Sequence, residues 1–293
     1  MKTLNIIGCG KVGRTLASLW AAGGVFEVRS VLNRSLPSAS RAVTFIGSGQ
    51  AVEHYSQLGR ADAVMISASD EAIDTCCRRL CRADVLAEGV VLFHCSGSQP
   101  STLLHPARAR GAAIAGVHPV KSFADPAEAV KTFAGTFCAV EGDPAACELL
   151  HDALHRCGGR TFCIAPESKT LYHAATVFVC NYLAALMEVG LRCLQRAGIS
   201  REIAMELIEP IVTETVANVC RLGPAGALTG PIARGEPSVV QKQCEALGQW
   251  DENLRDLYRL LGQVAVDLSA RQGHAPEDAL AAIKQLLRLS PDL

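Results

Sequence analysis

The sequence predicts an α/β protein in which a doubly wound, mainly parallel sheet is followed by an all-helical carboxy-terminal domain. Short β-rich segments alternate with helical segments over residues 1–165, an order typical of parallel sheets with helices on both faces. From residue 166 to residue 293 the apolar residues recur at helical spacing instead. We therefore expect two domains, 1–165 and 166–293.

Each expected element is an apolar run bounded by turn or capping residues. In the first domain the expected strands are 2–7, 26–32, 42–45, 63–67, 90–94, 113–117, 136–140 and 161–164. In the second domain the expected helices are 169–197, 201–222, 237–247, 251–271 and 276–289.

The first strand turns into a helix through Gly8, Gly10 and Gly13. Gly8 permits a tight turn, Gly10 lets a pyrophosphate approach the backbone, and Gly13 lets the helix pack closely. A strand on each side of this helix completes the βαβ unit that a dinucleotide requires. We therefore expect a nicotinamide or flavin nucleotide to contact these glycines and the residues between them: Cys9, Lys11 and Val12.

The end of the second strand, Asn33-Arg34-Ser35, carries no carboxylate. An acidic residue there would accept hydrogen bonds from the ribose 2′-hydroxyl of NAD, whereas a 2′-phosphate needs cationic and hydroxyl donors. Arg34 can pair with the phosphate, and Asn33 and Ser35 can donate hydrogen bonds. The sequence therefore favours NADP over NAD, with a solvated Arg34 in a polar loop as the alternative.

Three loops that follow strands are expected to meet at one crevice, because ligands of doubly wound sheets bind outside the carboxyl ends of strands. Ala68, Ser69 and Asp70 would pass over the ribose and nicotinamide, although Asp70 could instead cap the next helix. Ser96 could touch the nicotinamide or the substrate. His118 could carry a proton or act only as a hydrogen-bond brace.

Lys169 and His173 are the first candidates for proton exchange with a substrate. They lie four residues apart at the start of a long apolar helix and so share a face, which continues to Asn181. Polar residues on an apolar helix cost free energy unless they have a role. The alternatives are a solvated Lys169, a core His173 bonded to a carbonyl, and an interhelical hydrogen bond from Asn181.

A segment rich in Gly and Pro, residues 222–237, joins two expected helices. It offers a hydroxyl at Thr229, backbone N–H groups around Gly230 and a cation at Arg234. This combination favours capture of a small carboxylate or phosphate substrate. An interdomain or subunit-contact loop is the alternative.

The protein is expected in the cytoplasm, because neither a signal peptide nor a membrane span is expected. A net charge of −1 and a sequence pI near 6.7 argue against nucleic-acid binding, and the 13 cysteines contain no CxxC pair, so we expect no metal site. Because the first strand begins at residue 2, no signal peptide is expected. The longest apolar stretch, 174–191, is interrupted by Asn181 and Glu188, which favours a buried helix over a membrane span.

The whole set of motifs resembles the Rossmann-like NADP oxidoreductases whose carboxy-terminal half is a domain of unknown function. The segments that carry the resemblance are GCGKVG, NRS, ISASDEAI, FHCSGS, GVHPVKSF, KTLYHAATVFVCNYL and LTGPIARGE. More distantly, the chain is similar to β-hydroxyacid dehydrogenases, deazaflavin-dependent NADP reductases, pyrroline-5-carboxylate reductases and, through His118-Pro119, prephenate dehydrogenases.

The resemblance implies a catalytic Lys169, cofactor contacts at the glycines of the turn and at the predicted loop residues, and a homodimer formed through the helical domain. Hydroxyacid dehydrogenases place Asn four residues after this lysine, where the present chain has His173. The expected function is an NADP-dependent oxidoreductase acting on a small, anionic carbonyl, imine or hydroxy compound. The alternatives are a nucleotide-binding sensor without turnover and a prephenate-dehydrogenase-like enzyme.

Overall fold

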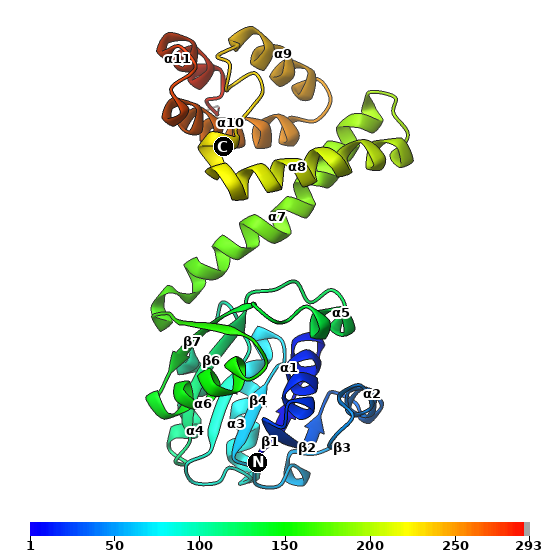
Figure 1. The fold of residues 1–293 in the computed structure, drawn as a ribbon, viewed down its shortest axis with the longest axis vertical. Helices are drawn as coiled ribbons and strands as arrows, with labels where there is room; N and C mark the ends of the chain where they lie inside the picture. The colour runs from blue at the N-terminus through cyan, green and yellow to red at the C-terminus, as the bar shows by residue number, and fades with distance from the viewer. Residues whose placement is uncertain (290–293) are drawn as a thin grey trace. The chain divides into compact units, whose positions relative to one another are not determined.

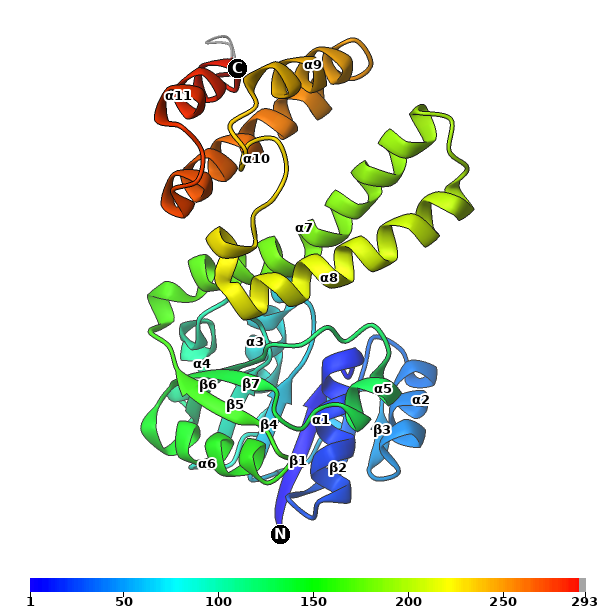
Figure 2. The ribbon, with the colours of Figure 1, turned by 45° about the horizontal axis from the view of Figure 1, so that its top comes forward.

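The computed structural model describes residues 1–289, which fall into two compact units (Figures 1 and 2). The first unit spans Met1–Tyr182 and the second begins at Leu183. The division lies inside helix α7 (Lys169–Arg196), so this helix contributes to both units.

The first unit contains one eight-stranded sheet in the order β3-β2-β1-β4-β5-β6-β7-β8. Its strands are β1 (Lys2–Ile7), β2 (Phe26–Leu32), β3 (Gln50–Val52), β4 (Ala63–Ile66), β5 (Val91–His94), β6 (Ala113–Pro119), β7 (Phe137–Gly142) and β8 (Arg160–Cys163). Strands β1 to β6 are parallel, whereas β7 pairs with β6 in the antiparallel sense. The strand order reverses direction at β1, which places the crevice at the carboxyl ends of β1 and β4.

Helices cover both faces of this sheet, as the alternating pattern predicts. One face packs against α1 (Lys11–Ala22), α2 (Leu36–Ile46) and α6 (Pro144–His155), and the other against α3 (Ile73–Ala83) and α4 (His105–Arg108). A short α5 (Pro126–Lys131) contacts α1. The doubly wound, mainly parallel α/β class is therefore confirmed.

One predicted strand of the sheet is wrong, and one observed strand was not predicted. Residues 42–45, expected as a strand, belong to α2, and the third strand is β3 at residues 50–52 instead. The short run Ala-Val-Thr-Phe fits a buried helix face as well as a strand, and the Ser-Leu-Pro start at residue 35 favours the helix.

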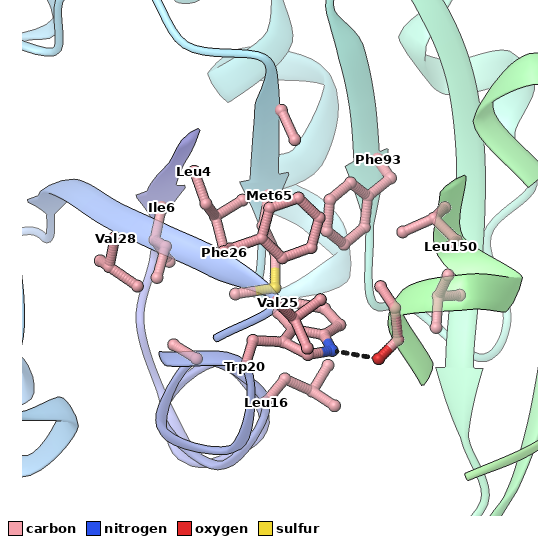
Figure 3. Close-up of a cluster of buried hydrophobic side chains, with 14 of the residues drawn as sticks. Leu4, Ile6, Leu16, Trp20, Val25, Phe26, Val28, Met65, Phe93 and Leu150 are labelled. Atoms are coloured by element: carbon pink, nitrogen blue, oxygen red, sulfur yellow. Dashed lines mark hydrogen bonds between the residues drawn. The ribbon is translucent and has the colours of Figure 1, made fainter. Parts of the chain in front are cut away.

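Trp20 of α1 lies at the centre of the larger core of this unit (Figure 3). Its ring packs edge-on against Phe26 of β2 and Phe93 of β5, with centroids 5.3 and 6.1 Å apart. The indole N–H donates to the carbonyl of Ala153 at 2.9 Å, so the one polar atom of the ring is satisfied without water. This packing joins the carboxyl-terminal part of α1, together with α6, to the sheet.

The second unit is helical in the residues that the structure describes. After the carboxy-terminal part of α7 it contains α8 (Arg201–Ala227), α9 (Pro237–Gly248), α10 (Glu252–Gln272) and α11 (Glu277–Leu286). Helices α9, α10 and α11 share a small core around Val240, Val266 and Ile283. All five expected helices are present, and α8 extends past Gly223, where the backbone leaves helical geometry.

The prediction that the apolar stretch of α7 is buried is wrong for the single chain. Its large apolar side chains are exposed, with Phe178 at 66% and Val179 at 70% of full exposure, and Asn181 is exposed too. The helical segment Pro166–Arg196 is long and apolar enough to cross a membrane. A single helix of this kind is weak evidence for a membrane protein. The spacing of apolar residues shows which face of the helix avoids water. It does not show whether the same chain, another chain or a membrane covers that face.

Candidate functional site

The glycine turn between β1 and α1 is shaped by the loop that follows β4. Gly8 has a φ of +73°, and a Cβ there would lie 2.6 Å from the Cα of Ala68. A Cβ on Gly13 would lie 2.6 Å from the Oγ of Ser67. Gly10 differs, because the nearest atoms to a Cβ built there are the carbonyl oxygens of Gly8 and Ser67, at 3.9 and 4.0 Å. Gly8 and Gly13 thus serve packing, whereas Gly10 leaves open space above the turn.

The amino end of α1 is open to an anion. Gly10 caps the helix without a side-chain hydrogen bond, the first turn holds no acidic residue, and Lys11 stands there instead. A cation at this end opposes the helix dipole, so a negative partner would stabilise the arrangement. Within residues 1–289 the backbone N–H groups of Lys11 and Val12 donate to no protein acceptor.

The residues after β2 have two different roles in the structure. The Oδ1 of Asn33 accepts a hydrogen bond from the backbone N–H of Cys9 at 2.7 Å, and its Nδ2 donates to the Oγ of Ser38. Asn33 therefore braces the glycine turn. Arg34 and Ser35 are exposed, and Arg34 forms no hydrogen bond or ion pair with any of residues 1–289.

Cys9 is a packing residue. Its side chain is buried, and burial raises the pKa of its thiol to about 12. The nearby charge of Arg14 opposes this shift but does not outweigh it. The thiol is thus protonated and unreactive at neutral pH.

The loops after β4 and β5 and the end of β6 meet at a pocket of about 250 Å³. The lining combines the start of α1 with these loops and with α7: Val12, Ser67, Ala68, Asp70, Cys95, Ser96, Gly97, His118, Pro119, Lys121, Phe123 and His173. Asp70 connects two of the loops, because its carboxylate accepts a hydrogen bond from the Ser98 hydroxyl at 2.6 Å. The convergence expected from the fold is thus present, and Ser69 lies at the start of the same turn.

Ser96 is positioned by its own loop. Its Oγ accepts hydrogen bonds from the backbone N–H groups of Ser98 and Gln99, and its backbone N–H donates to the Nδ1 of His94. His94 is fully buried, and burial followed by the charge of Lys169 lowers its pKa to about 4. His94 is therefore a neutral support below the pocket.

A buried ion pair lies behind this pocket. The Nζ of Lys169 is 3.3 Å from the Oε1 of Glu141, and each side chain is only 1% exposed. The backbone N–H and the Oγ of Ser101 also donate to the two oxygens of Glu141, at 2.8 and 2.6 Å. Burial lowers the pKa of Lys169, and the charge of Glu141 opposes that shift. The pair and these hydrogen bonds form one connected network centred on the carboxylate of Glu141.

The ion pair explains a glycine in the neighbouring strand. Gly116 of β6 lies directly opposite Glu141 of β7. A Cβ on Gly116 would collide with the Oε1 of Glu141 and lie 2.7 Å from the Nζ of Lys169. The sheet therefore has room for these two charges only because residue 116 has no side chain.

Two predicted residues of the first unit lie outside this cluster, and three others belong to the second unit. Lys169 does not line the pocket, and Asn181 is exposed twelve residues further along α7. Thr229, Gly230 and Arg234 belong to the second unit, where both oxygens of Glu236 pair with the guanidinium of Arg234 at 2.9 Å. Their proposed role in substrate binding stays a prediction.

Two residues of the site, Glu141 and Tyr172, were not predicted from the sequence. Glu141 ends the apolar run TFCAV, so a carboxylate inside a strand was the available signal. Tyr172 lies between two predicted residues, and its hydroxyl is 2.9 Å from the Nδ1 of His118. Nothing in the helical spacing distinguishes it from an apolar core residue.

Family models match both parts of the chain. A Rossmann-like domain matches residues 2–119, and a domain of unknown function (DUF2520) matches residues 136–265. The chain therefore carries a Rossmann-like domain followed by a DUF2520 domain, as the resemblance predicted. No curated protein matches the chain.

Solved structures share this fold at low sequence identity. A Thermotoga maritima protein is 23% identical, with a TM-score of 0.74 over 92% of this chain and 99% of that one. A "putative NADP oxidoreductase" from Bacteroides fragilis is 19% identical, with a TM-score of 0.73 over 92% and 98%. A pyrroline-5-carboxylate reductase from Coxiella burnetii is 17% identical, with a TM-score of 0.58 over 98% and 99%.

Proposed function

We propose that this protein is an NADP-dependent oxidoreductase that transfers a hydride between nicotinamide and a small, anionic carbonyl, imine or hydroxy compound. The observation that carries the proposal is one pocket lined both by Val12 at the open end of α1 and by Ser96, His118 and His173. An anion site and candidate proton-exchange groups share this pocket. The names of the Bacteroides fragilis and Coxiella burnetii proteins agree with this class of reaction.

The residues around the glycine turn fit a dinucleotide. The space above Gly10 and the unpaired N–H groups of Lys11 and Val12 suit a pyrophosphate. Arg34 and Ser35 are exposed and suit a 2′-phosphate, which favours NADP over NAD. Asn33 would act through the turn that it braces, while Ala68, Ser69 and Asp70 would lie along the ribose and nicotinamide.

Reduced nicotinamide, when bound, supplies the hydride, and the chain must bind the substrate and exchange one proton. Ser96, His118 and His173 are the proposed substrate contacts, because all three line the pocket. Lys169 is the proposed proton donor or base. Burial supports this role, since a lowered pKa makes its ammonium a stronger acid. Lys169 is 1% exposed and does not line the pocket. This role therefore requires that its ammonium group contact the substrate once cofactor and substrate are bound.

Calorimetry with NADPH and NADH, followed by turnover assays with small keto acids and cyclic imines, tests the cofactor and the reaction. We expect NADPH to bind more tightly than NADH, and Arg34→Ala to weaken NADPH binding about tenfold or more while leaving NADH unaffected. Arg29→Ala is the matched control, because Arg29 is an exposed arginine in the middle of β2 whose guanidinium donates to the carbonyl of Arg60. If neither NADPH nor NADH binds, the proposal is overturned.

A second variant separates catalysis from binding. Lys169→Met should abolish turnover and leave NADPH affinity nearly unchanged, since Lys169 lies behind the pocket. Unaltered turnover would remove Lys169 from the mechanism. Tight NADPH binding with no turnover of any substrate by the wild-type protein would instead favour the sensor.

We further propose that the protein forms a homodimer through its helical part. Support comes from the exposed apolar side chains of α7 and α8, among them Phe178, Val179, Ile203 and Ile211. Phe178→Asp should yield monomers in analytical ultracentrifugation, whereas the matched control Gln195→Asp, at an exposed polar position of α7, should stay dimeric. A wild-type monomer that floats with lipid vesicles would contradict this proposal and favour a membrane contact for α7.

A further inference from the structure

His118 is held from two sides by neighbouring residues of α7. Its Nδ1 lies 2.9 Å from the hydroxyl of Tyr172, and the two rings pack edge-on with centroids 5.6 Å apart. The His173 ring packs edge-on against it at the same centroid distance. Phe162 of β8 supports the far side of Tyr172 at 6.1 Å. The imidazole therefore has a defined orientation before any ligand binds.

The direction of the hydrogen bond between Tyr172 and His118 follows from the chemistry of the two groups. A phenol is a stronger acid than a neutral imidazole, and an imidazole nitrogen is a stronger acceptor than a phenol oxygen. The favoured arrangement has Tyr172 O–H donating to Nδ1 of His118. Nδ1 then carries no proton, so the single proton of the neutral ring resides on Nε2.

The other ring nitrogen faces the pocket. A Cβ on Gly97 would lie 2.8 Å from the Nε2 of His118, and Gly97 and His118 both line the pocket. No hydrogen-bond partner for Nε2 occurs within residues 1–289. Because residue 97 has no side chain, the Nε2–H group of His118 is free to donate a hydrogen bond to a ligand in the pocket.

Burial keeps the His118 ring neutral. It is the main reason that the pKa of His118 falls to about 4, and the neighbouring His173 and the charge of Lys169 lower it further. The carboxylate of Asp70 opposes them but does not outweigh them. Burial also raises the pKa of Tyr172 to about 12, so its hydroxyl keeps its proton. Both groups are uncharged at neutral pH.

We propose that Tyr172 is a positioning residue that fixes His118 as the Nε2–H tautomer, so that the pocket presents a neutral hydrogen-bond donor to the oxygen or nitrogen of the substrate's reducible bond. This role rests on the proposed oxidoreductase function. A neutral donor polarises a carbonyl or imine bond without adding a charge to the pocket. It matches substrates in which negative charge develops on that heteroatom as hydride arrives at carbon.

The test measures the tautomer directly and needs neither cofactor nor substrate. Long-range proton–nitrogen NMR of protein labelled with ¹⁵N at histidine distinguishes the Nε2–H form from the Nδ1–H form, and the signal missing from His118→Asn identifies residue 118. We expect Nε2–H in the wild type and a mixture of forms in Tyr172→Phe. Tyr182→Phe is the matched control, a half-exposed tyrosine of the same helix, and should leave the tautomer unchanged.

Kinetics add a second readout. With saturating NADPH, Tyr172→Phe should lower kcat/KM about tenfold, the equivalent of one hydrogen bond, and Tyr182→Phe should not. Nδ1–H in the wild type, or an unchanged tautomer in Tyr172→Phe, would overturn the inference. If neither the wild-type protein nor any variant binds NADPH, the proposed oxidoreductase function is wrong. The NMR result still shows in that case whether Tyr172 fixes the tautomer of His118.

Discussion

Two ion pairs contain residues that the sequence analysis predicted to be functional, and the pairs differ in their exposure to water. Lys169 pairs with Glu141 where both side chains are 1% exposed, whereas Arg234 pairs with Glu236 where the side chains are 61% and 37% exposed. The buried charges change the pKa values of neighbouring histidines, and the exposed pair lies in water that screens it. Burial and fixed partners, more than the type of charged residue, therefore decide how strongly a charge changes the pKa values of its neighbours.

The largest effect is expected from breaking the buried pair. Glu141→Gln leaves an ammonium group in the interior without its counter-charge, so the free energy of unfolding should fall by about 3–5 kcal/mol. Urea denaturation measures it. Lys169→Met and the double variant complete the cycle, and the double variant should lose less than the sum of the single variants. Additive losses would mean that the two groups do not interact.

A smaller effect for each pH unit is expected from acid. The pKa of His94 is lowered to about 4 chiefly by burial, and that of His118 likewise. In the unfolded chain both titrate near 6.5, so between about pH 6.5 and pH 4 the unfolded state binds more protons. The free energy of unfolding should therefore fall as the pH falls through this window, by up to about 1.4 kcal/mol per pH unit for each histidine.

Urea denaturation at pH 7, 6 and 5 measures this slope. His118→Asn should flatten it, and His274→Asn, which changes an exposed histidine, should not. A slope that stays the same in His118→Asn would show that His118 is not protected from protonation in the folded protein.

The smallest effect is expected at the exposed pair. Arg234→Ala should leave the free energy of unfolding nearly unchanged, because solvated pairs contribute little. If Arg234 binds the substrate as proposed, KM should rise in this variant while the melting temperature stays the same. An unchanged KM would leave Arg234 without a role in substrate binding, and a large loss of stability would contradict the distinction between the two pairs.

Much of the fold could be predicted because it depends on local pattern. The glycine turn, five of the six parallel strands and all the helices of the second unit follow from apolar spacing and from turn and cap residues. Residues 42–45 were misassigned because so short a run, Ala-Val-Thr-Phe, fits either periodicity. The convergence of the loops that carry Asp70, Ser96 and His118 was also predictable, since parallel strands end at the same edge of a sheet.

The sequence by itself determined the Rossmann-like turn, the order of the elements and the residue types available at the carboxyl ends of the strands. Only the tertiary structure decided that Glu141 meets Lys169, that Gly116 makes room for them, and that Tyr172 contacts His118. These partners are 28 and 54 residues apart, and neither helical nor strand periodicity carries information over such separations. Burial, which sets their charges and pKa values, exists only once the chain has brought them together.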